Sequence, residues 1–349
     1  MSQNLCSRRY NFGMKFDWKG VNKYVAKYHT DTVEFCPNAS MMLSGSYELN
    51  SETQERLGGL LLFSRLPTDN QYTLSCTVSC SGVLDTSWIN DNIAVSALAN
   101  GSSKLWNCTD QSLLVELVDF PVSPDHILLS VDSCSNRFVF SDSGGNISLW
   151  QFIAKWHAHE FEAWCACLNK WQSEIVFTGG DDSKCCLWDL REGCQKPMNT
   201  IRQNMGVCSI QNHPDIDYLI STGSYDESLC IWDLRMLNSG KEFSNPIFTC
   251  HFGGGVWRHK WGPHNCIVVG AMHAGFAVTH WSQSSCNTEE KNPVYVFRLT
   301  DQQLAYGIDW SFDGYSSGGD DNLLKPVVVS CSFYDNTIEF GELTINLDL

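Results

Sequence analysis

The sequence predicts an all-β protein, a seven-bladed β-propeller of the WD40 repeat type. Two segments show the repeat most clearly: residues 178–191 read TGGDDSKCCLWDLR and residues 222–235 read TGSYDESLCIWDLR, with eight of fourteen positions identical at an offset of 44. Apolar runs that close on a bulky side chain are separated by 43, 44, 38 and 44 residues, ending at Phe63, Trp106, Trp150, Trp188 and Trp232. A period of about 40–45 residues with Trp-Asp at the end of a strand is typical of four-stranded propeller blades.

Two weaker copies complete the ring. IVVGAMHAGFAVT ends at Thr279, and VVVSCSFYDNTIEFG ends at Gly341, so neither closes on a tryptophan. A single blade cannot bury both of its faces, and blades must therefore stack around an axis. Seven copies fit the 349 residues of the chain.

The innermost strand of each blade should lie just upstream of its copy. We expect these strands within residues 32–37, 82–89, 160–171, 206–214, 254–263 and 305–311, and that of blade 3 within 112–120 or 127–133. A segment at about residues 23–30 has no blade of its own, and we expect it to supply the outer strand of the last blade. Such closure removes exposed strand edges. The predicted domains are a partly mobile extension, residues 1–22, and one propeller, residues 23–349.

The repeated aspartate six residues before each tryptophan has a structural explanation. In blade 4 we expect Asp182 to hold a tight turn and to bind His159, which in turn contacts Thr178 and Trp188. A buried carboxylate needs such partners. Blade 5 keeps the equivalent side chains but no evident histidine: Thr222, Asp226 and Trp232.

Composition narrows the possible functions. The net charge is −16, with 39 acidic and 23 basic residues, which disfavours nucleic acid and anionic membranes and favours cationic ligands. The first twenty residues lack an apolar signal core, so we expect a cytoplasmic chain without a secretory signal, acting as a monomer. The 17 cysteines are then expected to be free thiols in apolar strands.

Several residues at the expected rim of the central channel are not required by the repeat. The positions before the turn aspartates hold Asp181, Tyr225 and Tyr334, and the turn of blade 6 has His273 where an aspartate is expected. The starts of the inner strands add Glu162, Trp164, Trp257 and Arg258. Carboxylates beside aromatic faces favour a cation, quaternary ammonium included. A general protein-docking face is the alternative.

Motifs of common enzyme classes are absent. The sequence has no Gly-x-Ser-x-Gly, no phosphate loop and no His-Glu-x-x-His. His157 and His159 are two apart in WHAHEFEAW, yet a third ligand is missing, so we expect no metal.

The chain resembles the diphthine methyl ester hydrolase family of diphthamide biosynthesis, whose members are also labelled diphthine methyltransferases. The resemblance rests on WHAHEFEAW (156–164), GGGVWRHKWGPH (253–264), MHAGF (272–276), LAYGIDWS (304–311) and SCSFYDNTIEF (330–340). A general WD40 repeat accounts for GGDD and IWDLR but not for these segments in this order. Blades 2 and 3 match poorly.

The resemblance implies a cytosolic enzyme without a cofactor. The reaction would be hydrolysis of the methyl ester of methylated diphthine, on the modified histidine of translation elongation factor 2. The product, diphthine, is then amidated by another enzyme. The substrate carries a trimethylammonium group, which an acidic, aromatic rim would favour.

The residues suggest roles in such a reaction. Water activation is assigned to Glu162, Asp181 or His273, and oxyanion stabilisation to Arg258. The ammonium would contact Trp164, Tyr225, Trp257 and Tyr334. A covalent route through Ser224 or Ser332 stays open, as does a non-catalytic adaptor that docks elongation factor 2 or another protein.

Overall fold

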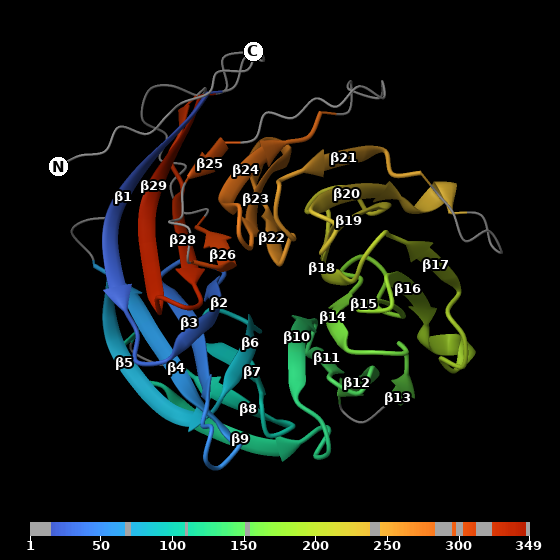
Figure 1. The fold of residues 1–349 in the computed structure, drawn as a ribbon, viewed down its shortest axis with the longest axis horizontal. Coiled ribbons are helices and arrows are strands. Elements are labelled where there is room, and N and C mark those ends of the chain that lie inside the picture. The colour runs from blue at the N-terminus through green and yellow to red at the C-terminus, as the bar shows by residue number, and fades with distance from the viewer. Residues whose placement is uncertain are drawn as a thin grey trace.

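Seven antiparallel sheets stand around a central axis as the blades of a propeller, as the repeat predicts (Figure 1). The computed structural model describes residues 15–66, 71–108, 111–150, 154–237, 245–282, 295–297, 303–311 and 323–346. Each blade starts with its inner strand and proceeds outward in chain order, except the last.

The blades of the first half are regular four-stranded sheets. Blade 1 contains β2 (His29–Phe35), β3 (Met41–Leu49), β4 (Arg56–Arg65) and β5 (Tyr72–Ser81). Blade 2 contains β6 (Val83–Trp88), β7 (Ile93–Leu98), β8 (Ser102–Asn107) and β9 (Val115–Pro121). Blade 3 contains β10 (Leu128–Cys134), β11 (Arg137–Asp142), β12 (Asn146–Trp150) and β13 (Ala154–His157).

Blades 4 to 6 follow the same order. Blade 4 contains β14 (Ala163–Leu168), β15 (Ile175–Gly180), β16 (Lys184–Asp189) and β17 (Asn199–Arg202). Blade 5 contains β18 (Val207–Asn212), β19 (Leu219–Ser224), β20 (Ser228–Asp233) and β21 (Phe248–His251). Blade 6 contains β22 (Arg258–Trp261), β23 (Cys266–Ala271), β24 (Gly275–His280) and β25 (Tyr295–Phe297). Short 3₁₀ turns follow three of their strands: η2 (Leu190–Glu192), η3 (Leu234–Met236) and η4 (Pro263–Asn265).

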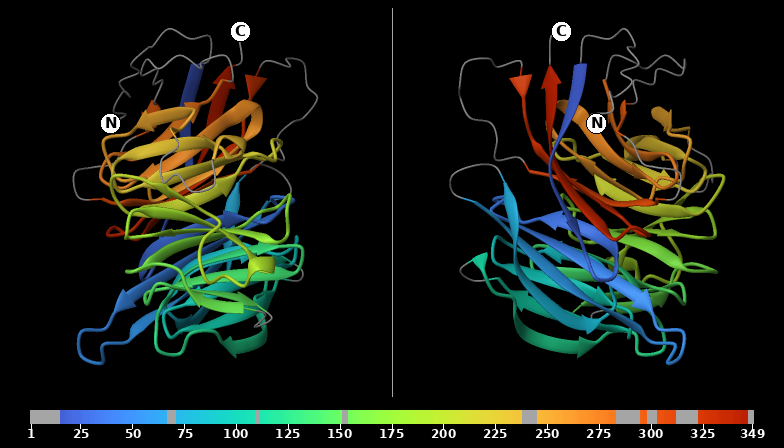
Figure 2. Two further views of the ribbon diagram at one scale, coloured as in Figure 1. Left: turned by 90° about the vertical axis from the view of Figure 1, so that its right-hand side faces the viewer. Right: turned by 60° about the vertical axis from the view of Figure 1, so that its left-hand side comes forward.

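The last blade joins the two halves of the chain. It contains β26 (Ala305–Trp310), β28 (Val327–Ser332), β29 (Thr337–Asn346) and, outermost, β1 (Lys15–Val25), while the short β27 (Leu323–Leu324) also pairs with β29. Figure 2 shows β1 and β29 side by side. The propeller is thus closed by the N-terminal strand.

The position of the closing strand differs from the sequence prediction. It runs over Lys15–Val25 rather than residues 23–30, because the ten residues of β29 pair with it through to Lys15, opposite Asn346. His29 and Thr30 instead begin the first inner strand. Residues 15–22 therefore belong to the propeller and not to an extension, and residues 1–14 lie outside the described residues.

The missing tryptophan of the last blade is replaced from another strand. The indole of Trp18 on β1 lies so close over Gly341 that a Cβ at this position would come within 2.2 Å of the ring. Trp18 also packs against the buried cluster that includes Ile308, Trp310 and Val328. A large side chain is thus still supplied to this core, and the glycine leaves the room for it.

The inner strands line the channel in layers. Residues two apart on these strands face the axis, and those between them face the blades. β2, β6, β10, β14, β18 and β26 each have a register shift close to their first residue. Such bulges re-aim side chains and often occur beside active sites. The extra residues include Asp31 on β2 and Trp164 on β14.

The other inner strands agree with the sequence prediction, with blade 3 using its second alternative. The first alternative, residues 112–120, instead contains most of β9, the outer strand of blade 2. The described cysteines are free thiols, and most are buried among apolar side chains. None of the helical turns in the described ranges is long and apolar enough to cross a bilayer.

Candidate functional site

Six aromatic side chains meet at one end of the channel. We call them the aromatic mouth: Tyr47, Trp164, Tyr225, Trp257, Tyr306 and Phe333. Their ring centroids are 4.8 to 6.1 Å apart in consecutive contacts, and the closest pair, Trp257 and Tyr306, is stacked. Offset and edge-on contacts at these distances are favourable. Four of the six rings stay partly exposed, so their faces are available to a ligand.

Two of the predicted rim carboxylates lie beside this mouth. The indole Nε1 of Trp164 donates a hydrogen bond to Asp181 Oδ1 at 3.1 Å, and the amide of Asp181 donates to the carbonyl of Glu162 at 2.9 Å. Asp181 is exposed and Glu162 is half-buried. The blade 4 side of the mouth is therefore both acidic and aromatic.

Two further residues predicted at the rim, His273 and Tyr334, lie further out. His273 is exposed on the turn after β23 and forms no hydrogen bond or ion pair with the described residues. Tyr334 is 61% exposed, with its ring edge-on to Phe333 and to His29. The structure thus brings Glu162 and Asp181 together and leaves His273 on a separate blade.

Arg258 lies inside the channel instead of on the rim. Its Nη1 donates to the carbonyl oxygens of Cys208 and Trp257 at 3.3 and 3.4 Å, and its Nη2 lies 3.7 Å from Asp85 Oδ2. Burial alone would lower the pKa of Arg258, but the carboxylates of Asp85 and Asp31 raise it. The guanidinium therefore keeps its charge below the aromatic mouth.

The structure places in the channel several carboxyl groups that the sequence did not indicate, and Asp31 lies nearest to the aromatic rings among them in its electrostatic effect. Asp31, the bulge residue of β2, is 3% exposed, and its Oδ1 has no hydrogen-bond partner among the described residues. Burial raises its pKa to about 7, against the opposing charge of Arg258. The Trp257 indole lowers this pKa slightly, yet no well-formed hydrogen bond joins the two, and Trp257 Nε1 is also unpartnered.

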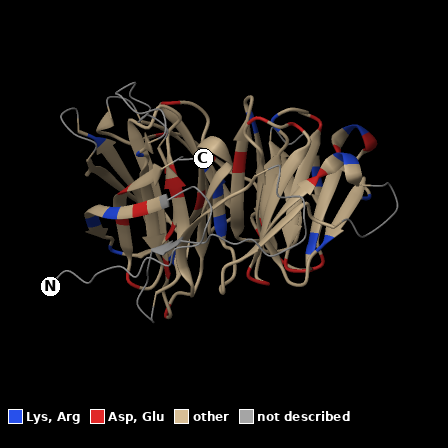
Figure 3. Cartoon of the chain, turned by 90° about the horizontal axis from the view of Figure 1, so that it is seen from above, with Lys and Arg blue, Asp and Glu red and all other residues tan. Residues whose placement is uncertain are grey.

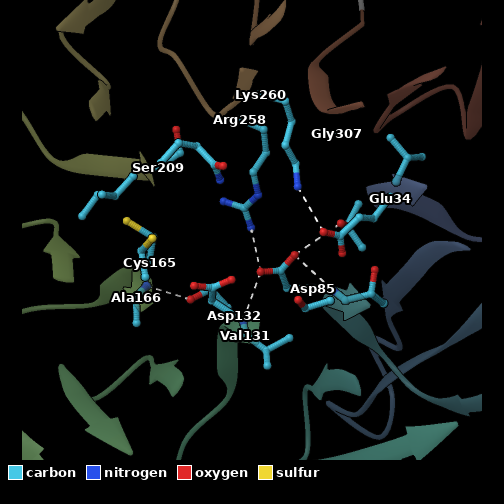
Figure 4. A pocket seen from close by; sticks show the side chains of 18 of the residues that line it. Glu34, Asp85, Val131, Asp132, Cys165, Ala166, Ser209, Arg258, Lys260 and Gly307 are labelled. Atoms are coloured by element: carbon cyan, nitrogen blue, oxygen red, sulfur yellow. Dashed lines mark hydrogen bonds and ion pairs between the residues drawn. The ribbon is translucent and has the colours of Figure 1, made fainter. Parts of the chain in front are cut away.

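A polar cavity of about 70 Å³ follows deeper in the channel. Figure 4 shows Glu34, Asp85, Asp132, Arg258 and Lys260 directed into it from four different blades. This volume is enough for several water molecules. The charged and neutral polar groups of this wall can hydrogen-bond such water.

Most of these deeper charges have partners. Asp85 accepts hydrogen bonds from Thr32 Oγ1 and from the amide of Val131, at 3.3 and 3.1 Å. Lys260 Nζ lies 3.1 Å from Glu34 Oε1. Burial raises the pKa of Glu34 to about 8 although Lys260 opposes the rise, and the same contact keeps the pKa of Lys260 high. Lys260 therefore keeps its charge beside Glu34.

The bracing side chains of blade 4 form a separate, complete network. His159 Nδ1 lies 2.9 Å from Asp182 Oδ1, and His159 Nε2 lies 2.8 Å from Thr178 Oγ1. Trp188 Nε1 donates to the same hydroxyl at 2.9 Å. The network occupies the interior of a blade, and its polar atoms are used within it.

Blade 5 is braced in another way. Trp232 Nε1 donates to Thr222 Oγ1 at 2.8 Å, and Asp226 Oδ1 accepts from the amide of Ser228 at 3.0 Å. No histidine was expected here, yet His259 of the next blade bridges two serines of blade 5, Ser209 and Ser221, at 2.6 and 2.7 Å. His259 follows Arg258 on the inner strand of blade 6, and this position is the only sequence signal that could have indicated its bridging role.

The two serines considered for a covalent route differ. Ser224 Oγ donates to the carbonyl of Met205 at 3.2 Å and accepts from the amide of Asp226. Ser332 Oγ is buried without a hydrogen-bond partner in the part of the chain that the structure describes. No histidine is within hydrogen-bond distance of either hydroxyl among the described residues. The described His, Cys, Asp and Glu side chains form no group of three suited to a metal ion.

Fold and site together define a WD40-type propeller with an aromatic mouth over a buried, charged channel. Relatives of the chain include a diphthine methyltransferase homolog of Dictyostelium discoideum, 31% identical over 89% of this chain and 95% of the relative. The diphthine methyltransferases of Homo sapiens and Mus musculus are 30% and 32% identical over 81% of this chain, and 72% and 67% of their own lengths. The chain belongs to the diphthine methyltransferase family.

One further comparison concerns the fold. A chain in a crystal structure of the mitotic checkpoint complex matches with a TM-score of 0.72 at 13% identity, over 98% of this chain and 97% of that one. At this identity the match shows the propeller fold alone. No family model matches the sequence.

Proposed function

We propose that the protein is a carboxylic ester hydrolase that removes the methyl group from methylated diphthine on translation elongation factor 2. The product is diphthine, ready for the final amidation of diphthamide biosynthesis. The observation that supports this most is the aromatic mouth with Asp181 and Glu162 at its edge, in a chain of the diphthine methyltransferase family. The reaction would take place in the cytoplasm, where elongation factor 2 works.

The substrate's trimethylammonium group fits the aromatic mouth. A quaternary ammonium cannot donate hydrogen bonds and is best held by π faces and carboxylates. Trp164 and Tyr225 offer partly exposed rings, and Trp164 is fixed by its bond to Asp181. Trp257 is buried and packs edge-on against Trp164, and the exposed Tyr334 stands at the outer edge. The acidic side of blade 4 adds attraction for the cation.

The channel below supplies groups for the ester. Hydrolysis requires a base that activates water and a donor for the developing oxyanion. The charged guanidinium of Arg258 is such a donor, and the adjacent cavity admits water. Glu162, Asp181 and His273 are accessible at the rim as bases for water outside the rings. The names of the relatives state methyl transfer, but hydrolysis needs only water as its second reactant.

Mass spectrometry of elongation factor 2 tests the proposal. The purified protein is incubated with elongation factor 2 that carries methylated diphthine, with no methyl donor added. We expect the modified peptide to lose about 14 Da, the mass of the CH₂ exchanged when a methyl ester becomes an acid. A gain of this mass from diphthine and a methyl donor would instead establish a transferase.

The adaptor alternative gives a different result in the same assay. A docking protein would bind elongation factor 2 and leave the mass of the peptide unchanged.

Trp164→Ala is the informative variant, because it removes a ring and releases Asp181. We expect it to raise KM roughly tenfold, in line with about 1–2 kcal/mol for a cation over an aromatic face. Trp171→Ala, at an exposed position away from the mouth, is the matched control.

A further inference from the structure

We propose that Asp31 is the general base of the hydrolysis, acting on a water molecule between its free Oδ1 and the substrate ester. This inference rests on the proposed function. It assigns the base to a residue below the aromatic mouth, in place of the rim groups Glu162, Asp181 and His273.

The first argument is the lack of a partner. Asp31 Oδ1 is fully buried without a hydrogen bond, while the deeper Asp85 and Asp132 accept bonds from backbone amides of neighbouring blades. Leaving a buried carboxyl oxygen unpaired costs free energy, and such a cost is typical of functional sites. The bulge at the start of β2 is what places Asp31 there.

The second argument is position. Asp31 precedes Thr32, which lines the polar cavity of about 70 Å³, and, in addition to their burial, its charge raises the pKa of Tyr47 and Tyr306 in the aromatic mouth. The charged or titratable groups around it come from five strands: Tyr47, Asp85, Arg258, Tyr306 and Cys331. Asp31 therefore stands at the boundary between the aromatic mouth and the cavity.

The third argument is the direction in which the substrate must enter. Arg258 carries a positive charge at this depth and repels the trimethylammonium group. The ammonium therefore stays with the rings, and the ester, which is attached to the same carbon as the ammonium group, turns its carbonyl toward Arg258 and Asp31. Tyr47 and Tyr306 are half-exposed neighbours of Asp31, and we expect their rings to rotate aside when the ester enters. Rotations of exposed side chains are fast compared with enzyme turnover.

The chemical step balances with water as the second reactant. Asp31 removes one proton from water while the water oxygen bonds to the ester carbon, and the carbonyl electron pair moves to the oxygen beside Arg258. The tetrahedral intermediate then collapses and breaks the bond to the methoxy oxygen. Protonated Asp31 returns its proton to this leaving group, which departs as methanol. The new carboxylic acid releases a proton to solvent.

Steady-state kinetics of Asp31→Asn test the assignment, with Asp132→Asn as the matched control. Both replace a channel carboxyl by its isosteric amide; Asp31 is buried, and Asp132 is half-buried in the wall of the deeper cavity. With elongation factor 2 carrying methylated diphthine, we expect Asp31→Asn to lower kcat by about 100-fold or more, at a KM within roughly threefold of the wild type. Asp132→Asn should keep kcat within roughly threefold.

The pH profile separates a base from a merely structural residue. Wild-type kcat should decrease below about pH 7, and Asp31→Asn should lose this dependence. Asp31→Glu keeps a carboxyl group, so it should retain the acid limb at a reduced kcat, even if the Asn variant does not fold. Folded Asp31→Asn with more than about a tenth of wild-type kcat would overturn the inference but leave the hydrolase intact. A wild-type protein that removes no methyl group would overturn both.

Discussion

Blade 4 and the aromatic mouth each combine an aspartate with a tryptophan, but the two pairs differ in whether their polar atoms are hydrogen-bonded. In blade 4, Asp182 and Trp188 are both hydrogen-bonded through His159 and Thr178. At the mouth, the free atoms are Asp31 Oδ1 and Trp257 Nε1. Burial acts on both carboxyl groups. His159 and Lys184 more than offset it for Asp182, whose pKa is lowered, whereas the pKa of Asp31 is raised to about 7.

The difference separates scaffold from site. A satisfied network fixes a turn and has no free atom for a ligand. An unsatisfied pair costs stability and keeps atoms available for substrate and water. The same residue types therefore serve two purposes, and their partners decide which. Figure 3 shows charged positions on strands as well as on the loops that join them, so the presence of charge alone would not locate the site.

The largest expected effect is on the pH dependence of stability. Because the pKa of Asp31 is raised from 3.8 to about 7, the native protein holds a proton that the unfolded chain releases in this range. The free energy of unfolding should therefore decrease as pH rises from about 4 to about 7, by up to roughly 4 kcal/mol from this group. Asp31→Asn should lack this decrease in denaturant titrations across the range. If the free energy of unfolding changed with pH in the same way in both proteins, the pKa of Asp31 would not be raised, and its contrast with Asp182 would be lost.

The next effect concerns Arg258. Arg258→Met keeps the apolar stem and removes the charge, so the oxyanion loses its donor, and we expect kcat to decrease by about 10²–10³-fold. Arg258→Lys keeps a charge in a different geometry and should recover part of the activity. Rates measured in the peptide mass assay, with thermal unfolding as the fold control, decide the result. Unchanged kcat in Arg258→Met would place the ester elsewhere.

Removal of Asp182 should affect stability alone. Asp182→Ala leaves Nδ1 of the buried His159 without its partner, and we expect the free energy of unfolding to decrease by about 1–3 kcal/mol. The specific activity of the folded fraction should be unchanged. Urea titration and the peptide assay measure the two quantities separately. Loss of activity in a fully folded variant would mean that the division between scaffold and site is wrong.

The smallest effects are expected at the rim. Glu162→Ala and His273→Ala remove groups that lie outside the covered channel, so turnover should slow only a few-fold and the Tm should hardly change. Kinetics and thermal unfolding of both variants check this. A decrease as large as that of Asp31→Asn in either one would move the general base to the rim.

The fold was largely predictable because its signals are local and repeated. The Trp-Asp copies of blades 4 and 5 set the period, and Gly-rich turns located the strands around them. The boundary of β1 was not predictable in this way, since it is set by pairing with β29 at the other end of the chain. The packing role of Trp18 was not predictable either, because it depends on Gly341, which lies against its indole from the other end of the chain.

The site was predictable in part. Trp164, Tyr225 and Trp257 were expected near one another and do meet. Tyr306 and Asp31 were not indicated, because a bulge residue at the start of an inner strand has no motif of its own. Comparing the first residues of the inner strands in TDTVEF, EAWCAC and AYGIDW would have given a signal, since these place Asp31, Trp164 and Tyr306 at equivalent points.

The pairing of β1 with β29 has a consequence for biosynthesis. The partner residues are more than 300 positions apart, as in Lys15 and Asn346, so the ring can be completed only after nearly the whole chain has left the ribosome. Contacts of such high sequence separation form late and slowly. Until then β1 and the core around Trp310 stay uncovered, and newly made protein should depend on chaperones during this interval.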